Sequence, residues 1–169
     1  MMSSEKIKTK NVAIDMQIRI ASSGDIPALR ELFAQGLLEK DAPLNDTGAD
    51  LDHLVAGYFD CEDSCFWVAA IGEIVVGMIG VQRLDKNSAE MRRLRVHHGF
   101  RRQGIGTRLM EHAISFCRKK DFLKVVLDVR TERVSAISLF DNFGFINCRE
   151  RELGGRKIID FYLDLYTEN

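Results

Sequence analysis

Residues 101–107 have the sequence Arg101-Arg102-Gln103-Gly104-Ile105-Gly106-Thr107 and lie between a predicted strand and a predicted helix. Glycines at two of these positions let the backbone turn tightly and approach an anion without interference from a Cβ. The N–H groups at a helix start have no intrahelical partner, and the helix dipole places partial positive charge there. Two arginines and a threonine hydroxyl add further donors. The segment therefore predicts a binding site for a phosphate group.

Other phosphate-binding motifs do not fit the spacing. A nucleotide P-loop requires Gly-x-x-x-x-Gly-Lys-Ser/Thr, which the chain lacks. A dinucleotide fingerprint requires a third glycine at position 109, which is Leu109. A Gly-x-Gly pair alone also fits an ordinary turn, so the ligand has to be identified from the rest of the chain.

Hydrophobic periodicity and turn residues predict the elements around this segment. Helices are expected at 25–37, with Pro27 in the first turn, and at 51–59, 104–120 and 133–142. Strands are expected at 17–20, 65–71, 74–84, 89–96 and 125–129, followed by a hairpin from 145 to 165 that turns at Gly154-Gly155. This order predicts a mixed α/β fold around one largely antiparallel sheet.

Length and composition predict one globular domain. The chain has 169 residues, of which 46 % are hydrophobic and 29 % charged. We expect residues 1–15 to be a poorly ordered tail and residues 16–169 to form the domain. No apolar run approaches the roughly 20 residues that span a bilayer, and the polar N-terminus lacks the apolar segment of a signal peptide. We therefore expect a cytoplasmic protein without membrane contact.

The four cysteines have no metal-ligand or disulfide spacing, so free thiols and no metal are expected.

The charges are distributed unevenly, although the net charge is only −1. Residues 39–63 contain eight acidic side chains and one lysine, whereas residues 92–102 contain five arginines, two histidines and no acid. A near-neutral chain with few aromatic residues among its arginines is not typical of a nucleic-acid-binding domain, so no nucleic-acid partner is expected.

Two motifs resemble those of the GNAT superfamily of N-acetyltransferases. Arg-x-x-Gly-x-Gly at 101–106, after the strand at 90–96, resembles the family's acetyl-CoA motif. Residues 136–145, Ala-Ile-Ser-Leu-Phe-Asp-Asn-Phe-Gly-Phe, are similar to its Ala-Ile-x-Leu-Tyr-x-x-x-Gly-Phe signature. The element order from 17 to 165 also fits. The resemblance implies a twisted sheet of six to seven strands flanked by four helices, with splayed strands at 90–96 and 125–129.

The resemblance also implies an activity: transfer of an acetyl or other acyl group from acyl-CoA to a primary amine, directly within a ternary complex. A non-catalytic acyl-CoA sensor is the alternative. The pantetheine arm would pair with backbone groups of Leu94 and Val96, and an N–H near Leu94 or Arg95 would meet the thioester oxygen. The pyrophosphate would bind Arg101, Arg102, Gln103, Gly104, Ile105, Gly106 and Thr107.

The strand at 89–96 is irregular in its pattern. Met91 and Leu94 are both apolar, yet they cannot lie on one face of a regular strand. A β-bulge between them would reconcile the pattern, and the GNAT superfamily has one there. A regular strand in which Met91 faces a covering helix is the alternative.

Glu90 matches the position of the general base in several GNAT enzymes, and a salt bridge to Arg92 is its alternative role. Phe140 stands where many relatives have a tyrosine that protonates the leaving thiolate. Water or another side chain would then donate the proton. Alternatively, acid catalysis is dispensable because a simple thiol has a pKa of about 8.5 and its thiolate leaves readily. A third alternative is that catalysis is weak. Arg133 replaces the family's frequent asparagine and is a candidate contact for a cofactor phosphate.

The acceptor amine is not identified by the sequence, and neither is the choice between monomer and homodimer. In this fold the acidic region 39–63 usually overhangs the acceptor site. It would either attract a cationic amine or form an ordinary solvated surface.

Overall fold

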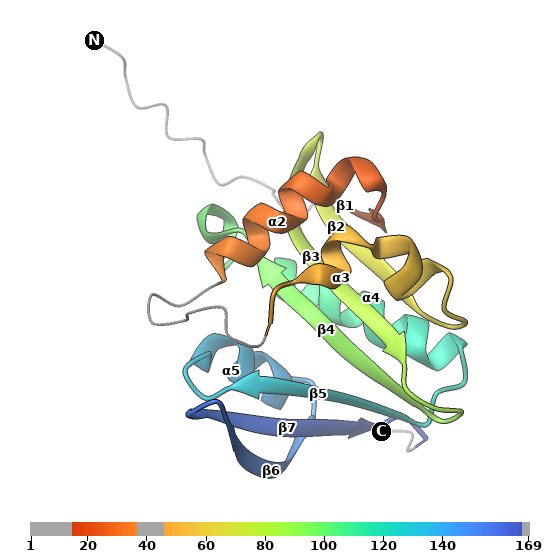
Figure 1. The fold of residues 1–169 in the computed structure, drawn as a ribbon, viewed down its shortest axis with the longest axis vertical. Coiled ribbons are helices and arrows are strands. Elements are labelled where there is room, and N and C mark those ends of the chain that lie inside the picture. The colour runs from red at the N-terminus through yellow and green to blue at the C-terminus, as the bar shows by residue number, and fades with distance from the viewer. Residues whose placement is uncertain (1–14, 37–45, 167–169) are drawn as a thin grey trace.

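The computed structural model describes residues 15–36 and 46–166 of the chain (Figure 1). Seven strands form one sheet in the order β1-β2-β3-β4-β5-β7-β6. Their bounds are β1 Met16–Ile20, β2 Cys65–Ile71, β3 Ile74–Arg83, β4 Ser88–Val96, β5 Lys124–Arg130, β6 Ile146–Leu153 and β7 Arg156–Asp164. All neighbours pair antiparallel except β4 and β5, which run parallel.

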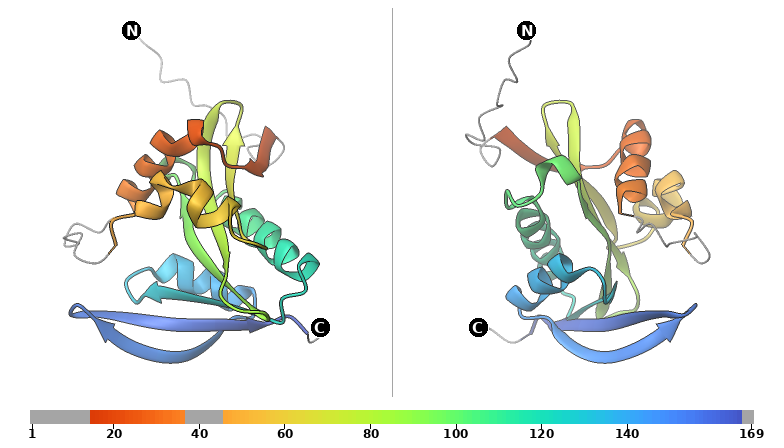
Figure 2. Two further views of the ribbon diagram at one scale, coloured as in Figure 1. Left: turned by 45° about the vertical axis from the view of Figure 1, so that its right-hand side comes forward. Right: turned by 90° about the vertical axis from the view of Figure 1, so that its left-hand side faces the viewer.

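The helices cover both faces of this sheet (Figure 2). One face carries α4 Ile105–Lys119 and α5 Val134–Asn142, and the other carries α2 Ile26–Gln35, α3 Ala49–Asp52 and a π-helical turn, η2 Val55–Phe59. Short 3₁₀ turns lie at η1 Ser23–Asp25 and η3 His98–Phe100. None of the helices described is long and apolar enough to cross a membrane.

Two apolar clusters fill the space between the layers. The larger one joins α4 and α5 to the central strands and includes Leu109, Met110 and Phe140. The smaller one lies under α2 and η2 and includes Leu29, Tyr58 and Phe66. The alternation of side chains along β2 and β3 supplies both clusters, because these strands are buried on both faces.

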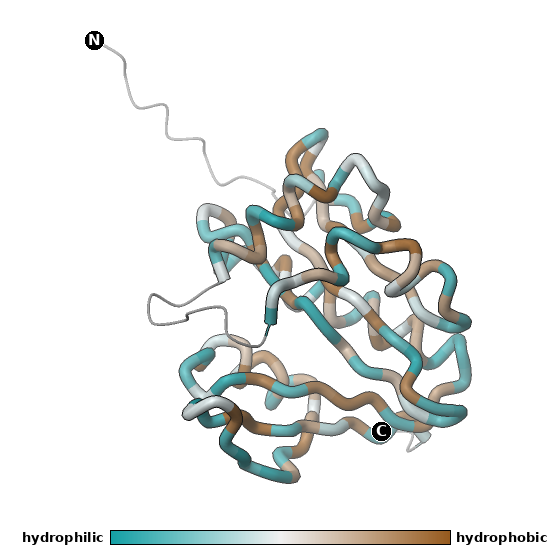
Figure 3. The backbone as a smooth tube through the Cα atoms, viewed as in Figure 1, coloured by the Kyte–Doolittle hydropathy of each residue, from teal (hydrophilic) through white to brown (hydrophobic). Residues whose placement is uncertain are grey.

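The central strands β4 and β5 meet at one end and then diverge (Figure 1). They pair only from Ser88 to Glu90 on β4, opposite Lys124 to Val126 on β5. Beyond Glu90, β4 keeps its other neighbour, β3, but has no partner toward β5. Figure 3 shows that the diverging part of β4 is largely hydrophilic, whereas β5 is largely hydrophobic. The predicted splay of these two strands is therefore confirmed.

A β-bulge interrupts β4 where the pattern of apolar residues predicted one. The register to β3 shifts between Met78, opposite Arg95, and Gly80, opposite Arg92. Arg93 within the bulge has a φ of 61°, a conformation that costs a non-glycine residue about 1 kcal/mol or more. The bulge lets Met91 and Leu94 both contribute to the larger apolar cluster. The bulge is thus confirmed and the regular-strand alternative is wrong.

Most predicted elements agree with the structure, except that the helix expected at 51–59 is divided. α3 ends at Asp52, and His53 leaves the helical region with φ −129° and ψ 52° before the π-helical turn begins. Nearly all of the predicted N-terminal tail lies outside the described residues.

Candidate active site

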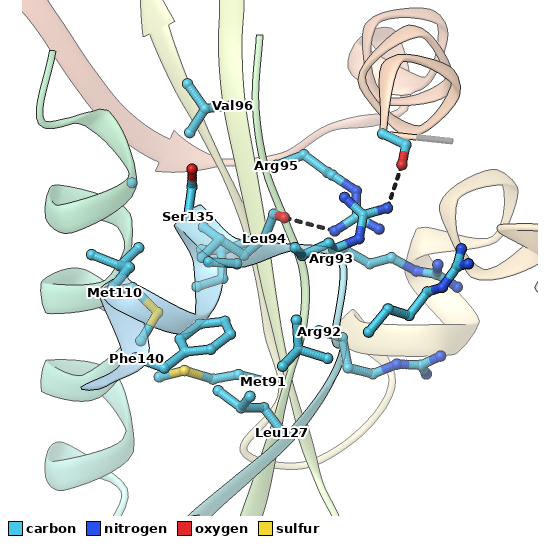
Figure 4. A pocket seen from close by; sticks show the side chains of 18 of the residues that line it. Met91, Arg92, Arg93, Leu94, Arg95, Val96, Met110, Leu127, Ser135 and Phe140 are labelled. Atoms are coloured by element: carbon cyan, nitrogen blue, oxygen red, sulfur yellow. Dashed lines mark hydrogen bonds between the residues drawn. The ribbon is translucent and has the colours of Figure 1, made fainter. Parts of the chain in front are cut away.

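A pocket of about 1170 Å³ opens where β4 and β5 diverge. Its walls come from both diverging strands, the start of α4, the start of α5 and the end of α2. Figure 4 shows that its two sides differ: Met91, Leu94, Met110, Leu127 and Phe140 lie toward α4, and Arg92, Arg93 and Arg95 point the opposite way, toward α2 and α3. The bulge explains this division, because it places both Leu94 and Met91 on the α4 side.

The start of α4 forms the anion-binding end of the pocket. Gly104 has a φ of 79°, and the first backbone hydrogen bond of the helix runs from Arg108 N to Gly104 O at 3.1 Å. The amides of residues 105–107 therefore have no intrahelical acceptor and face the pocket opening. Among the described residues, neither Arg101 nor Arg102 forms an ion pair.

The predicted phosphate-binding residues come together here with one exception. Arg101, Arg102, Gly104, Ile105, Gly106 and Thr107 all line the pocket. Gln103 does not line it. The side chain of Gln103 instead has a buried Oε1 atom without a hydrogen-bond partner in the part of the chain described.

The backbone of β4 presents its unpaired edge to the gap. His97 N donates to Val76 O on β3 at 2.8 Å. Because alternate residues of a strand direct their N–H and C=O groups to opposite sides, the groups of Val96 and Leu94 face away from β3, toward β5. The Leu94 carbonyl already accepts a hydrogen bond from the side chain of Arg95, at 2.8 Å. Val96 therefore offers the more accessible edge to an extended ligand.

Glu90 lies at the point where the two strands separate, and it lines the pocket. Burial raises the pKa of its carboxyl, Arg92 opposes this effect, and Asp128 across the gap reinforces it. The Arg92 Nε lies 3.8 Å from the Glu90 Oε1, which is a loose ion pair. Both predicted roles of Glu90 therefore have a structural basis, and the long contact leaves the carboxylate available to a ligand.

Phe140 forms part of the apolar wall. Its ring is 5 % exposed and packs against Phe145 and Phe161, with ring centroids 5.9 and 6.0 Å apart. The hydroxyl groups among the described lining residues belong to Thr107, Ser135 and Ser138, and no tyrosine is among them.

Arg93 belongs to an ion-paired group, here called the Arg93 cluster, which comprises Arg93, Asp46, Asp50 and Tyr58. Its guanidinium, whose side chain is 6 % exposed, contacts Asp46 and Asp50 at 2.5 and 2.6 Å. Tyr58 Oη donates to Asp50 at 2.6 Å. Burial raises the pKa of Asp50, but the hydrogen bonds from Arg93 and Tyr58 outweigh it, so the pKa is lowered overall. Hydrogen bonding to Arg93 lowers the pKa of Asp46.

This arrangement does not support the predicted acidic lid that would attract a cationic amine. Two of its acids are held by Arg93, and a third, Asp52, is held by Arg30. The acidic residues Glu39 and Asp41 lie outside the described residues.

Arg95 and Arg133, here called the Arg95 cluster, have the opposite surroundings. The Nε of Arg95 is buried without a hydrogen-bond partner, and no carboxylate of the described residues forms an ion pair with Arg95. Burial and neighbouring guanidinium groups, that of Arg133 foremost, lower the pKa of Arg95 to about 9, which leaves it charged at neutral pH. Arg133 donates to Gly36 O at the end of α2. Arg133 also lines the pocket, and its pKa is lowered by burial and by neighbouring arginines that include Arg101, so its contact with a cofactor phosphate stays a prediction.

Two residues of the site were not predicted from the sequence. Asp128 faces Glu90 across the gap. It is the one charged residue within the otherwise apolar stretch 125–129, and this exception could have been used to predict it as a site residue. Gly36 packs directly on Arg95: a Cβ at this position would lie 2.4 Å from the Arg95 Nε. Contacts between segments 59 positions apart leave no local signal in a sequence.

Within residues 15–36 and 46–166, no group of three or more side chains could hold a metal ion.

Comparisons with known proteins agree with this geometry. The model of the Acetyltransferase (GNAT) family matches residues 29–145. N-acetyltransferase 8 from Homo sapiens is 36 % identical over 101 residues, which are 57 % of this chain and 44 % of that protein. N-acetylaspartate synthetase from Danio rerio is 34 % identical over 113 residues, which are 66 % of this chain and 39 % of that protein. The chain thus spans less than half the length of these two relatives.

Solved structures share the whole architecture. A protein from Salmonella typhimurium, solved with its cofactor acetyl-CoA, superposes with a TM-score of 0.76 at 20 % identity, covering 91 % of this chain and 96 % of that one. Likeness at this level of identity establishes the fold.

Proposed function

The chain belongs to the acetyltransferase (GNAT) family, and from this premise we propose that it transfers an acyl group from acyl-CoA to an amine. The nitrogen forms a bond to the acyl carbon, the carbon–sulfur bond breaks, and the proton lost by the amine balances the one gained by the CoA thiolate. One observation carries the proposal. A single pocket joins the open amides of α4, the unpaired edge of β4 and a carboxylate with a raised pKa.

The cofactor fits the α4 side of this pocket. The amides of residues 105–107 and the arginines Arg101 and Arg102 would hold the pyrophosphate, since a helix N-terminus and guanidinium groups both favour phosphate oxygens. Val96 would pair with the pantetheine arm in the manner of an added strand. The arm would lie against the apolar wall of Met110 and Phe140.

Glu90 is the proposed general base. An alkylamine has a pKa of about 10.4, so it must lose a proton before it attacks. A carboxylate whose pKa is raised by burial is a better proton acceptor near neutral pH than an exposed one. Phe140 offers no proton to the leaving thiolate, and we propose that departure relies on the low basicity of the thiolate, with water as the final proton donor.

The names of the relatives do not determine the acceptor. The Danio rerio protein is named for the synthesis of N-acetylaspartate and the Homo sapiens protein only for N-acetyl transfer. A small-molecule amine and a protein amine both remain within the proposal, as do an acetyl and a longer acyl group. A cytoplasmic location, a single domain from 16 to 169 and a monomeric or homodimeric state stay predictions from the sequence.

Acetyl-CoA binding and release of free thiol with a panel of amines test the proposal. We expect acetyl-CoA to raise the melting temperature and wild-type protein to release CoA only when an amine is present. Glu90→Gln should lower kcat roughly 10²- to 10⁴-fold without weakening acetyl-CoA binding. Glu73→Gln, in the exposed turn between β2 and β3, is the matched control. Absence of acetyl-CoA binding by folded protein would overturn the function, and full turnover by Glu90→Gln would remove its role as base.

A further inference from the structure

The acceptor side of the pocket contains a cationic group for which residues 15–36 and 46–166 supply no counter-ion. Arg95 extends from β4 on the face opposite α4, as Figure 4 shows, and it is one of the residues that line the pocket. Its Nη1 binds the Leu94 carbonyl, and its buried Nε has no partner within the described residues. A guanidinium presents five donors in a rigid fork, so most of its hydrogen-bonding capacity remains unused.

Neighbouring positive charges make the binding of an anion next to Arg95 more favourable. Arg133 is the largest electrostatic influence on Arg95 after burial, and burial with neighbouring arginines also lowers the pKa of Arg133. Asp46 attracts Arg95, but both oxygens of Asp46 are already bound by Arg93, at 2.5 and 2.8 Å. Burying like charges together without compensation opposes folding, and such clusters typically serve a bound ligand.

The Arg95 cluster and the amides of α4 are associated with opposite faces of the sheet, although Arg101, one of the proposed pyrophosphate ligands, lies near enough to lower the pKa of both Arg95 and Arg133. The amides that would hold the pyrophosphate start α4, which covers one face of the sheet, whereas Arg95 and Gly36 meet on the face covered by α2. On β3, Met78 and Gln82 are the partners of Arg95 and Glu90. Four residues at a rise of about 3.3 Å place Arg95 about 13 Å from Glu90 along the strand, before either side chain is counted. Both residues line the same pocket.

From these observations we propose that the acceptor is an amine that carries a carboxylate, of the α-amino acid class. Its carboxylate binds the Arg95 guanidinium, beside Arg133, while its amino group faces Glu90. A bidentate guanidinium–carboxylate pair satisfies the empty donors and fixes the orientation of the acceptor. Polyamines are disfavoured, because they would bring positive charge to a cluster that is already cationic.

This inference rests on the proposed transferase function and can fail separately from it. The decisive comparison is between each of the twenty L-amino acids and its α-carboxamide, which has nearly the same shape without the negative charge, with spermidine as a polycationic reference. We expect the amino acids that act as acceptors to exceed their carboxamides at least about 10-fold in kcat/KM, as loss of a charged hydrogen bond implies. Equal or faster acetylation of carboxamides or spermidine would overturn the inference and leave the transferase function intact.

Arg95→Gln tests the residue itself. The variant should lower kcat/KM for amino acids roughly 10- to 100-fold, mainly through KM, and bring the ratio of amino acid to carboxamide close to one. Its dissociation constant for acetyl-CoA should stay unchanged. If the variant instead weakens acetyl-CoA and spares the acceptor KM, then Arg95 binds a cofactor phosphate and the inference is wrong. Arg149→Gln, an exposed arginine on β6 whose side chain is 67 % accessible, is the control for loss of one positive charge.

Gly36→Ala tests the same contact without changing a charge. Gly36 has φ −79° and ψ −10°, a conformation open to alanine, but the added methyl carbon would lie 2.8 Å from Arg95 Cδ and closer to Nε. The Arg95 side chain must therefore move, and we expect a higher acceptor KM with little change in acetyl-CoA affinity. An unchanged acceptor KM in Gly36→Ala would contradict the assigned position of the guanidinium.

Calorimetry covers the case in which no amine is acetylated. Titration of CoA-loaded protein with the amino acids and their carboxamides measures carboxylate recognition without turnover. Binding of amino acids that Arg95→Gln abolishes would support the acceptor site although the transfer itself had failed. If acetyl-CoA binds but no amino acid does, by either measurement, the inference fails.

Discussion

Arg93 and Arg95 lie two positions apart on β4, and their side chains point to the same face of the sheet. The electrostatic surroundings of the two guanidinium groups are opposite. Arg93 is held by two carboxylates, one of which also accepts from Tyr58. Arg95 has another arginine as its main charged neighbour, and its buried Nε has no hydrogen-bond partner in the part of the chain that the structure describes. The Arg95 guanidinium is the more deeply buried of the two, so greater exposure to solvent does not explain its poorer set of partners among the described residues.

This contrast separates a structural role from a binding role. The Arg93 cluster ties the segment from Asp46 to Asp50 to the bulge of β4, and every charge in it has an oppositely charged partner within the cluster. The Arg95 cluster has no such partner among residues 15–36 and 46–166, and we propose that a bound anion supplies it. The Arg93 cluster should therefore control the stability of the fold, and the Arg95 cluster should control the affinity for the acceptor.

The largest effect is expected from Arg93→Met. The substitution leaves Asp50 half-buried beside Tyr58 without its cation, and breaking a buried ion pair costs about 3 kcal/mol of unfolding free energy. For a chain of this size the melting temperature should fall by about 6–12 °C. Thermal unfolding followed by circular dichroism measures it. A fall below 2 °C would show that the cluster contributes little to the fold.

A second prediction concerns acid pH and the same variant. The pKa values of Asp46 and Asp50 are lowered in the folded protein, so their stabilising effect is present above the unfolded-state value of about 3.9 and is lost as pH falls through the folded values. The difference in melting temperature between wild type and Arg93→Met should be constant from pH 7 to pH 5 and narrow below about pH 4. A difference that stays constant down to pH 3 would mean that these carboxylates do not interact with Arg93 in solution.

The arginines of β4 also show what the sequence could and could not predict. Periodicity located the strands and helices, because each element buries a regular pattern of its own residues. The paired apolar residues Met91 and Leu94 indicated the bulge, and the bulge then places Arg93 and Arg95 together on the other face. That second step follows from alternation alone and could have been predicted.

The partners of these arginines could not have been predicted. Asp50 is 43 positions from Arg93 and Gly36 is 59 positions from Arg95, and no local pattern links them. From the sequence, the acids between 46 and 52 could either attract a cationic amine or form a solvated surface, whereas in the structure Asp46, Asp50 and Asp52 are counter-ions of arginines. For the same reason, the hydrogen bond from Arg133 to Gly36 O at the end of α2 could not have been predicted. Sequence patterns show which residues share a face, and long-range contacts decide which charges remain uncompensated.

A smaller effect is expected from Tyr58→Phe. The phenol is buried, and its hydroxyl donates to Asp50 at 2.6 Å. Removing one hydrogen bond to a charged group, while Arg93 still binds the carboxylate, should cost about 1.5 kcal/mol and lower the melting temperature by about 3–6 °C. The acceptor KM should not change. A change in acceptor KM as large as that of Arg95→Gln would show that the two clusters are not independent.

The smallest effect on stability is expected from Arg95→Met, and it is the most informative of the four. Methionine approximates the volume of the arginine stem, and the removed guanidinium is a buried charge that the described residues do not neutralise. Replacing a poorly compensated buried charge by an apolar side chain is often neutral or stabilising, so the melting temperature of the ligand-free protein should be unchanged or higher. Amino-acid acceptors should lose their affinity in the same variant. If Arg95→Met unfolds as readily as Arg93→Met, then Arg95 supports the fold, and the division between a structural and a ligand-binding arginine is wrong. A protein that gains stability as it loses acceptor binding would show that the uncompensated charge is retained for its ligand.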